Sequence, residues 1–396
     1  MTQPIRVHVE LGPRSYPVLI GAEMLAQLGA TVRAQGLAHT NAFVITNEPV
    51  GAFYFEPVRA ALDAAGFTRI VRHDIIPPSE EGKSWDEFTR TCAALLAAFP
   101  DTGATPLVFL LGGGVVGDLG GFAAAVFRRG VPFVQIPTSL LAAVDSSVGG
   151  KVAVNFGGVK NIMGAFSQPR LVCCDLALLR TLSAREVRSG VSEVIKYGAV
   201  CSAPLFAQLE AGGLEKLLAL EPAALVDVVA QCVALKARVV EQDEFDKKGI
   251  RNVLNFGHTI GHALELSAAN YGITDPHARR LAAPSHGEAI AIGMMAATRL
   301  ARSLGMVDES FYERLKALVS RAELPVSFPD FRAKILSPIN DHADLFERVR
   351  RAMFMDKKFR DGKNVFVLPV AIGAWEQREN LDWALVDDAM HSVLTA

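Results

Sequence analysis

The chain has 396 residues, which is long enough for two or three domains, a substantial core and an enzyme active site. Its 40 basic residues nearly balance 42 acidic ones, and this net charge of -2 argues against binding of nucleic acid. No apolar run approaches the roughly 18 residues that a membrane span needs, and the alternating N-terminus does not resemble a signal peptide. Five scattered cysteines without CxxC spacing predict reduced thiols, so we expect a cytoplasmic protein.

The first half of the chain alternates short strand-like runs with helix-like patterns such as FEPVRAALDAAG and DEFTRTCAALLAAF. The clearest strand-like runs cover residues 42–46, 105–111, 132–139 and 170–176. This alternation predicts a parallel α/β sheet, whereas helical periods dominate from Ser183 to Leu324. We therefore expect an α/β domain over residues 1–180 and a mainly α-helical domain over residues 181–396.

A glycine-rich turn follows the apolar run LVFLL. Gly112, Gly113, Gly114 and Gly117 have GxGxxG spacing, and Asp118 is expected to open an alanine-rich helix. Such glycines let the backbone approach a pyrophosphate, whose charge is stabilised at a helix N-terminus. A purely structural turn explains the same glycines, and no acidic residue follows at the usual distance of about 20 residues. Nucleotide binding and a structural turn both remain open at this point.

Residues 137–166 predict a polar, glycine-rich loop. Asp145, Lys151, Asn155, Lys160 and Asn161 lie there among small residues, a composition suited to bringing polar groups close to a ligand. Lysines in such loops can bind phosphate as point charges. A solvated surface loop is the alternative interpretation.

The helical half contains a stripe of polar residues. Arg251, Asn255, His258 and His262 are separated by 4, 3 and 4 residues, which predicts one face of one helix. Four polar groups in this arrangement indicate a shared ligand.

Two further helices supply candidate ligands. Glu193 and Lys196 form an i,i+3 pair, and His286 and Glu288 open a later helical pattern. One carboxylate and two imidazoles from three helices predict a zinc-type site with one position open for substrate. The other histidines lack such neighbours and are expected to be structural: His8, His39, His73, His277, His342 and His391.

Together these motifs resemble the 3-dehydroquinate synthase family of sugar-phosphate cyclases. The matching strings include GPRSYPVLIG, PSEEGKS, GGGVVGDLGGF, RRGVPFVQIPTSLLAAVDSSVGGKVAVN, RNVLNFGHTIGHALE, SHGEAIAIGM and MDKKFRDGKNVFVLPVAIG. They occur in family order over essentially the whole chain. The segment ITDPHARRLAAP resembles an insertion between two of them.

The resemblance implies a dehydroquinate synthase-like fold. Its N-terminal Rossmann-like domain would bind NAD, its helical C-terminal domain would bind zinc or cobalt, and the substrate would lie between them. The implied reaction converts 3-deoxy-D-arabino-heptulosonate 7-phosphate to 3-dehydroquinate and phosphate, in the shikimate route to aromatic compounds. NAD would oxidise the substrate transiently and be restored, and the enzyme would be a homodimer.

The resemblance also implies roles for individual residues. The metal ligands would be Glu193, His258 and His286. The NAD site would contain Asn47, Glu80, Lys83, Gly112, Gly113, Gly114, Asp118, Thr138, Ser139, Lys160 and Thr181. Substrate-binding or catalytic positions would be Asp145, Lys151, Asn161, Lys196, Lys236, Arg251, Asn255, His262 and Lys357. Arg129 matches an arginine that family dimers contribute to the neighbouring active site.

Three other functions compete with this one. A related cyclase would act on sedoheptulose 7-phosphate and make a valiolone-type or gadusol-type product. That substrate lacks a carboxylate, so the stripe of Arg251, Asn255 and His262 favours dehydroquinate synthesis. A metal-dependent polyol dehydrogenase would have less use for the many lysines, and a non-catalytic protein would have little reason to keep all three sets of candidate residues.

Overall fold

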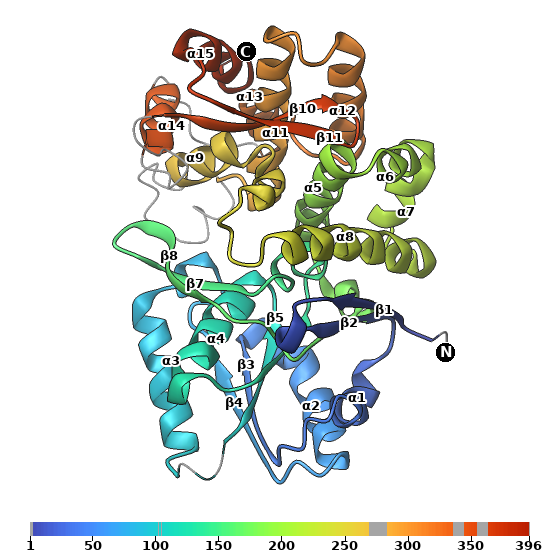
Figure 1. Ribbon diagram of the computed structural model, residues 1–396, viewed down its shortest axis with the longest axis vertical. Coiled ribbons are helices and arrows are strands. Elements are labelled where there is room, and N and C mark those ends of the chain that lie inside the picture. The colour runs from blue at the N-terminus through green and yellow to red at the C-terminus, as the bar shows by residue number, and fades with distance from the viewer. Residues whose placement is uncertain are drawn as a thin grey trace. The chain divides into compact units, whose positions relative to one another are not determined.

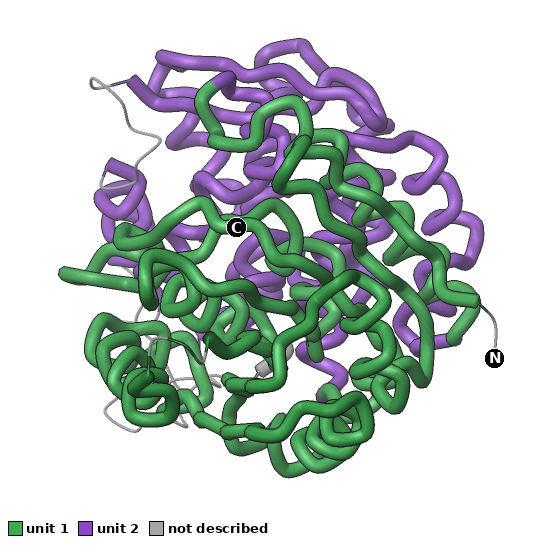
Figure 2. The backbone as a smooth tube through the Cα atoms, turned by 60° about the horizontal axis from the view of Figure 1, so that its bottom comes forward, with its two compact units in different colours: residues 1–182, 222–247 green, residues 183–221, 248–396 purple. Residues whose placement is uncertain are grey.

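The computed structural model describes residues 3–101, 103, 105–268, 283–335, 344–354 and 363–395. Contacts within the chain divide it into two compact units (Figure 2). Unit 1 comprises residues 1–182 and 222–247, and unit 2 comprises residues 183–221 and 248–396. Residues 222–247 thus belong to unit 1, although the segments before and after them belong to unit 2.

Unit 1 is built on a seven-stranded sheet with the order β1-β2-β9-β6-β5-β3-β4 (Figure 1). The strands are β1 (Ile5–Val9), β2 (Tyr16–Gly21), β3 (Asn41–Thr46), β4 (Arg69–Asp74), β5 (Leu107–Gly112), β6 (Phe133–Pro137) and β9 (Leu171–Asp175). β1 pairs antiparallel with β2, and every other pairing in this sheet is parallel. The predicted parallel α/β fold is confirmed.

Helices cover both faces of this sheet. They are α1 (Leu28–Ala34), α2 (Glu48–Ala64), α3 (Trp85–Ala98) and α4 (Gly114–Val126). Phe43 and Val108 pack in one core with α3 and α4, whereas Val44 and Phe109 pack in the other with α1 and α2. Successive side chains of a strand point to opposite faces, so β3 and β5 need apolar residues at every position. This requirement explains their uninterrupted apolar sequences.

The glycine-rich segment that we expected to be a loop contains a β-hairpin. β7 (Lys151–Phe156) and β8 (Val159–Phe166) pair antiparallel around a turn at residues 157–158. Both turn residues are glycines with positive φ, which is the backbone that tight hairpins need. The glycines in NFGGVKN were therefore a hairpin signal rather than a sign of loop structure.

The returning segment contains α8 (Pro222–Gln242). Its buried residues Leu225, Val228, Val229, Cys232 and Val233 recur at helical spacing and form one apolar stripe. This helix packs on β1 and β2 within unit 1. The observed division therefore differs from the single boundary near residue 180, because an amphipathic stripe does not specify which neighbour will cover it.

Unit 2 is mainly helical, as predicted. Its elements are α5 (Ala184–Cys201), α6 (Ala203–Gln208), α7 (Leu214–Leu218), η8 (Ile250–Asn255), α9 (His258–Ala268), α11 (His286–Ser303), α12 (Glu309–Arg321), α13 (Phe328–Ile335), α14 (Leu345–Phe354), β10 (Val365–Ala371), β11 (Ala374–Glu379) and α15 (Trp383–Leu394). α11 is buried around most of its circumference and contacts α5, α9, α12 and α15. It is the central helix of this unit.

Two expectations about the whole chain concern membranes and thiols. In the part of the chain that the structure describes, no helix combines the length and apolar character needed to span a bilayer. All five cysteines are free thiols. Burial raises the pKa of Cys173 to about 12 and that of Cys201 to about 11, so these thiols stay protonated and unreactive.

Candidate active site

Three helices of unit 2 bring four candidate metal-binding side chains together. Glu193 comes from α5, His258 and His262 from α9, and His286 from the first residue of α11. One ring nitrogen from each histidine lies within 4.8 Å of the others. Oε1 of Glu193 lies 3.2 Å from Nε2 of His286 and 3.6 Å from Nε2 of His258. The carboxylate of Glu193 and the Nε2 atoms of His258 and His286 therefore converge on one point, as metal ligands would.

The second ring nitrogens of the two predicted histidine ligands have partners of their own. Nδ1 of His258 donates to the carbonyl oxygen of Phe256 at 3.1 Å. Nδ1 of His286 faces Oε2 of Glu265 at 3.6 Å. Metal-bound histidines are commonly oriented in this way, with the far nitrogen held by a carbonyl or carboxylate and Nε2 left for the ion. The sequence analysis missed Glu265, which follows the second histidine of GHTIGHALE by three residues without a recognisable signal.

The electrostatics of this cluster favour a cation. Burial lowers the pKa of His286, but the neighbouring carboxylates of Glu193 and Glu265 outweigh burial and raise it to about 10. Two carboxylates that stabilise a positive charge on an imidazole would also stabilise a divalent cation at the same place. A carboxylate and imidazole nitrogens are the donors that zinc and cobalt accept.

A close approach of two helices places His286 beside Glu193. The N–H of Gly287 donates to Oγ of Ser189 on α5 at 3.0 Å. A Cβ added at Gly287 would lie only 2.2 Å from the carbonyl oxygen of Ser189, so no larger residue fits. Ser285 and Glu288 form a capping box at the start of α11, which fixes where the helix begins.

The polar stripe predicted on one helix is interrupted. Arg251 and Asn255 lie in the short helix η8, and α9 starts afresh at His258. Gly257 between them has φ of 79°, and its backbone passes so close to α11 that an added Cβ would lie 2.8 Å from the nitrogen of Met294. The prediction of one continuous helix is therefore wrong at residues 256–257, although His258 and His262 do share one helix.

Lys196 and Arg251 are buried cations of unit 2, and Lys196 contacts this cluster. Lys196, only 1% exposed, pairs with Glu193 and donates to the carbonyl oxygen of Leu254 at 2.8 Å. Arg251 is 2% exposed, and Asn255 at the end of η8 is half-buried. Lys357 lies outside the described residues, as does most of the segment that resembles an insertion.

In unit 1, predicted NAD-binding residues follow the carboxyl ends of parallel strands. Asn47 follows β3 and caps α2, Gly113 joins β5 to α4, and Thr138 follows β6. Thr181 lies in the short helix η6 (Leu176–Thr181) after β9. The chain proceeds from β3 to β4 on one side and from β5 to β6 on the other, which makes β3 and β5 the switch point where such sheets bind nucleotides.

The start of α4 suits a phosphate group. Gly113 caps this helix without a side-chain partner, so the first N–H groups face outward from the turn. A Cβ added at Gly113 would lie 3.3 Å from Oγ of Ser139 and would narrow the approach. α4 begins at Gly114, so Asp118 lies one turn inside the helix and does not open it.

Buried charges surround that turn. Lys83, 4% exposed, pairs with Asp118. Burial raises the pKa of Asp118, and the charge of Lys83 only partly offsets this effect. On the β7–β8 hairpin, Nδ2 of Asn155 donates to Glu80 at 3.0 Å, and Nζ of Lys160 lies 4.0 Å from the same carboxylate.

Predicted substrate-binding residues of unit 1 form ion pairs. Nζ of Lys236 on α8 lies 2.9 Å from Oδ1 of Asp145 in the short helix η5 (Ala142–Ser146). Nζ of Lys151 donates to Asp246 at 2.7 Å, a partner that the sequence analysis missed. Asn161 is exposed on β8, and Arg129 is exposed in the turn after α4.

Comparison with known proteins decides the family. Residues 73–189 match the model of the 3-dehydroquinate synthase N-terminal domain, and residues 190–359 match that of the C-terminal domain. The chain is 41% identical over 367 residues to 3-dehydroquinate synthase of Desulforamulus reducens, which covers 93% of this chain and 94% of the relative.

The chain belongs to the 3-dehydroquinate synthase family.

A second family member gives the same result. The 3-dehydroquinate synthase of Geobacter metallireducens is 42% identical over 369 residues, 93% of each chain. The family and function implied by the motifs are therefore confirmed, and the chain is an enzyme. The roles of individual residues stay predictions.

Solved structures agree with the fold. A 2-epi-5-epi-valiolone synthase from Streptomyces hygroscopicus, solved with NAD+ and Zn2+, has a TM-score of 0.79 and 26% identity, with 97% of each chain covered. A 2-deoxy-scyllo-inosose synthase, solved with carbaglucose-6-phosphate, NAD+ and Co2+, has a TM-score of 0.79 at 21% identity, with 98% of this chain and 100% of that chain covered. The dehydroquinate synthase-like fold is confirmed.

Proposed function

We propose that this enzyme converts 3-deoxy-D-arabino-heptulosonate 7-phosphate to 3-dehydroquinate and phosphate as a carbon–oxygen lyase. The convergence of Glu193, His258 and His286 carries the proposal, because it supplies a metal site within a chain of this family. Relatives named 3-dehydroquinate synthase at 41% and 42% identity support the same substrate.

Glu193, His258 and His286 would hold a divalent metal, zinc or cobalt. Their donor atoms, the occupied far nitrogens of both histidines and the negative surroundings of His286 all fit such an ion. When bound, the metal supplies Lewis-acid polarisation of a substrate oxygen. His262 lies beside the ligands, with its ring centroid 4.9 Å from that of His258, and would transfer a proton to or from the substrate.

Asn47, Gly113, Thr138 and Thr181 would hold NAD at the switch point of the sheet. The start of α4, where no side chain caps the helix, fits a pyrophosphate, and the two solved relatives carry NAD+. When bound, NAD supplies a hydride acceptor that is later restored. Lys83 would hold Asp118 in place behind this turn.

The remaining predicted residues would recognise the substrate. Lys151 would bind its phosphate, because an ammonium next to a single carboxylate can exchange that partner for a phosphate oxygen. Arg251 would bind its carboxylate, since a guanidinium can donate two parallel hydrogen bonds to one carboxylate. Burial of Arg251 would strengthen this interaction.

One assay tests the proposal. The purified enzyme is given NAD, a divalent metal and either 3-deoxy-D-arabino-heptulosonate 7-phosphate or sedoheptulose 7-phosphate, and phosphate release and the carbocyclic product are measured. We expect phosphate release from the heptulosonate with no net gain of NADH absorbance, because oxidation and reduction cancel. Stoichiometric NADH would indicate a dehydrogenase instead.

The related cyclase activity is the second candidate, because the solved valiolone synthase shares the fold over 97% of the chain. Preference for sedoheptulose 7-phosphate in the same assay would establish it and reject dehydroquinate synthesis.

Family resemblance completes the proposal with two further features. The enzyme would be a cytoplasmic homodimer, and Arg129 would serve the neighbouring active site. Sedimentation of the purified enzyme tests the dimer.

A further inference from the structure

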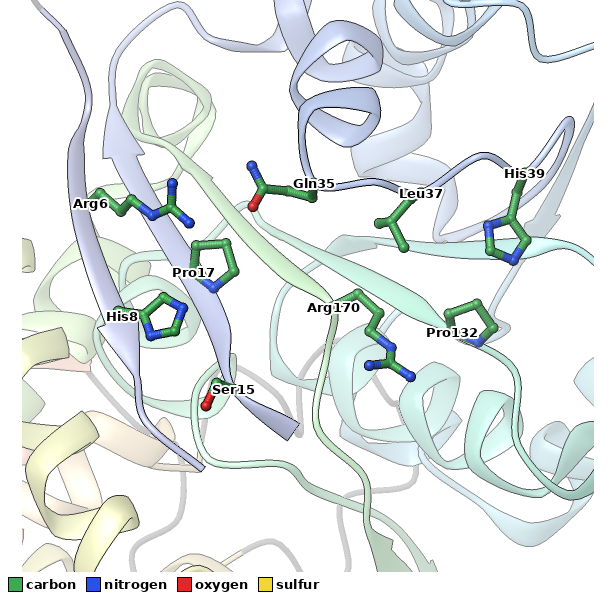
Figure 3. A pocket seen from close by; sticks show the side chains of 9 residues that line it. All are labelled: Arg6, His8, Ser15, Pro17, Gln35, Leu37, His39, Pro132 and Arg170. Atoms are coloured by element: carbon green, nitrogen blue, oxygen red, sulfur yellow. The ribbon is translucent and has the colours of Figure 1, made fainter. Parts of the chain in front are cut away.

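Unit 1 contains a pocket at the opposite edge of its sheet from the predicted NAD site. The pocket has a volume of about 390 Å³ and lies where β6 and β9 begin, next to the β1–β2 hairpin (Figure 3). Gly113 and Thr138, by contrast, follow the ends of β5 and β6. The pocket is therefore separate from the candidate active site, and nothing in the proposed reaction uses it.

The positions of its polar residues follow from strand geometry. Arg6 and His8 lie two residues apart on β1, so both side chains leave the same face. His8 pairs with Pro17 of β2 in the sheet register. Arg170 comes from the residue before β9, and His39 from the segment that leads into β3. Figure 3 shows Arg6 and His8 on one strand, and Arg170 and His39 on two other segments that line the same pocket.

The pocket carries an excess of positive charge. The guanidinium groups of Arg6 and Arg170 form no ion pair and no hydrogen bond with the described part of the chain. Among the described residues, Glu10 is the one acidic partner of a pocket residue, with Oε1 2.6 Å from Nδ1 of His8. Elsewhere in unit 1, Arg59 pairs with Glu56 at 2.7 Å and Arg14 with Glu244 at 2.7 Å. Two guanidinium groups without an ion-pair partner therefore give this pocket its positive charge.

One of the residues that line the pocket has an unmet hydrogen-bonding group. Nδ1 of His39 is shielded from solvent and has no hydrogen-bond partner among the described residues. Buried polar atoms without partners are uncommon and costly, so a ligand or ordered water is expected to supply one. Pro17, Leu37 and Pro132 provide an uncharged wall beside these polar groups.

We propose that this pocket binds a small organic anion. Its carboxylate or phosphate would contact Arg6 and Arg170, because guanidinium groups bind both kinds of oxyanion through paired hydrogen bonds. Its uncharged body would rest on Leu37 and the two prolines. The volume falls within the range of small-molecule sites. This inference does not depend on the proposed reaction.

Calorimetric titration with phenyl phosphate and with benzoate tests the proposal and separates the two oxyanions. Benzyl alcohol serves as the uncharged probe of similar shape and is expected not to bind. We expect at least one anion to bind the enzyme, and its affinity to fall at least tenfold in the Arg6→Gln/Arg170→Gln variant. The Arg6→Lys/Arg170→Lys variant should lose less, because charge remains while the paired hydrogen bonds do not.

Two controls locate the bound probe. Arg59→Gln removes an arginine that already has a carboxylate partner and should leave the affinity unchanged. Lys151→Gln alters the proposed substrate phosphate site and should also leave it unchanged. The proposal fails if the double glutamine variant binds the anions as tightly as the parent, or if only Lys151→Gln weakens binding. It also fails if the double variant changes only the sedimentation of the ligand-free enzyme, which would indicate a contact between copies.

Discussion

Among the histidines of unit 2, geometry separates ligand candidates from a proton-transfer candidate. His258 and His286 direct Nε2 toward Glu193 and use Nδ1 for other partners. His262 lies within the same cluster, so a three-histidine site is the competing arrangement. The distinction depends on which nitrogens are committed elsewhere, and mutagenesis can test it directly.

We expect His258→Ala to lower zinc affinity by at least about a hundredfold, because a three-ligand site loses a donor and its geometry. His262→Asn should retain zinc within about threefold while losing most of the turnover. Zinc content after dialysis and binding titrations measure both effects. His391→Ala, which removes a ring stacked on Phe346, is the control. Loss of zinc in His262→Asn would favour the three-histidine site instead.

Glu265 is expected to position His286 without touching the substrate. Glu265→Gln should lower zinc affinity by roughly 10-fold to 100-fold, because the neutral amide holds the imidazole less firmly and removes negative charge. At saturating zinc, turnover should largely recover. Glu309→Gln, which alters a surface partner of Arg302, is the matched control. Unchanged zinc affinity in Glu265→Gln would rule out the positioning role.

At the scale of elements, the candidate metal site depends on how closely α5, α9 and α11 pack. Each of the three helices has an ordinary helical sequence. No one of these sequences by itself specifies that the ligands will meet. Gly287 allows α11 to touch α5, and Gly257 allows the chain to pass α11 before α9 starts. The site therefore depends on glycines that allow close helix packing as much as on the ligand side chains themselves.

Gly287→Ala is expected to destabilise the enzyme by about 1–3 kcal/mol, since the new Cβ would overlap the carbonyl oxygen of Ser189. Displacement of α11 should also weaken zinc binding through His286. Denaturant unfolding and zinc titration measure the two effects. Gly305, two residues past the other end of α11, has a positive φ of 69° and no neighbouring atom where a Cβ would lie. Gly305→Ala should therefore lower stability through backbone strain but leave zinc affinity unchanged. Equal zinc affinity in both variants would contradict this account.

At the scale of the whole molecule, stability should depend on the protonation of His73 in unit 1. This histidine is 8% exposed, stacks on Phe43 and lies 3.1 Å from Oγ1 of Thr91. Burial, with a smaller contribution from the charge of Arg90, lowers the pKa of His73 below its ordinary 6.5. The native enzyme therefore keeps this imidazole neutral where the unfolded chain takes up a proton.

It follows that the free energy of unfolding should fall as the pH drops below about 6.5, with no contribution from His73 above it. Replacement by glutamine, which keeps a hydrogen-bonding amide, should reduce the loss of stability between pH 7.5 and pH 5.5. Urea unfolding of the parent and His73→Gln at both pH values measures the difference. An equal or larger loss in His73→Gln would contradict the lowered pKa.

The sequence alone was enough to predict the parallel α/β sheet, the helical second half and the family. These features depend on local signals: apolar runs at strand length, helical periods, a glycine turn after a strand, and motifs in a characteristic order. The same motifs named the three metal-ligand candidates, and the structure brings their donor atoms together. Local patterns sufficed here because each signal lies within one element.

Only the tertiary structure decided which elements meet. It assigned α8 to unit 1, where Lys236 reaches Asp145, although its sequence fits either neighbour. It broke the expected polar helix at Gly257 and set Glu265 behind His286. A helical period records which face is buried but not what covers it, so partners distant in sequence emerge only when the elements pack.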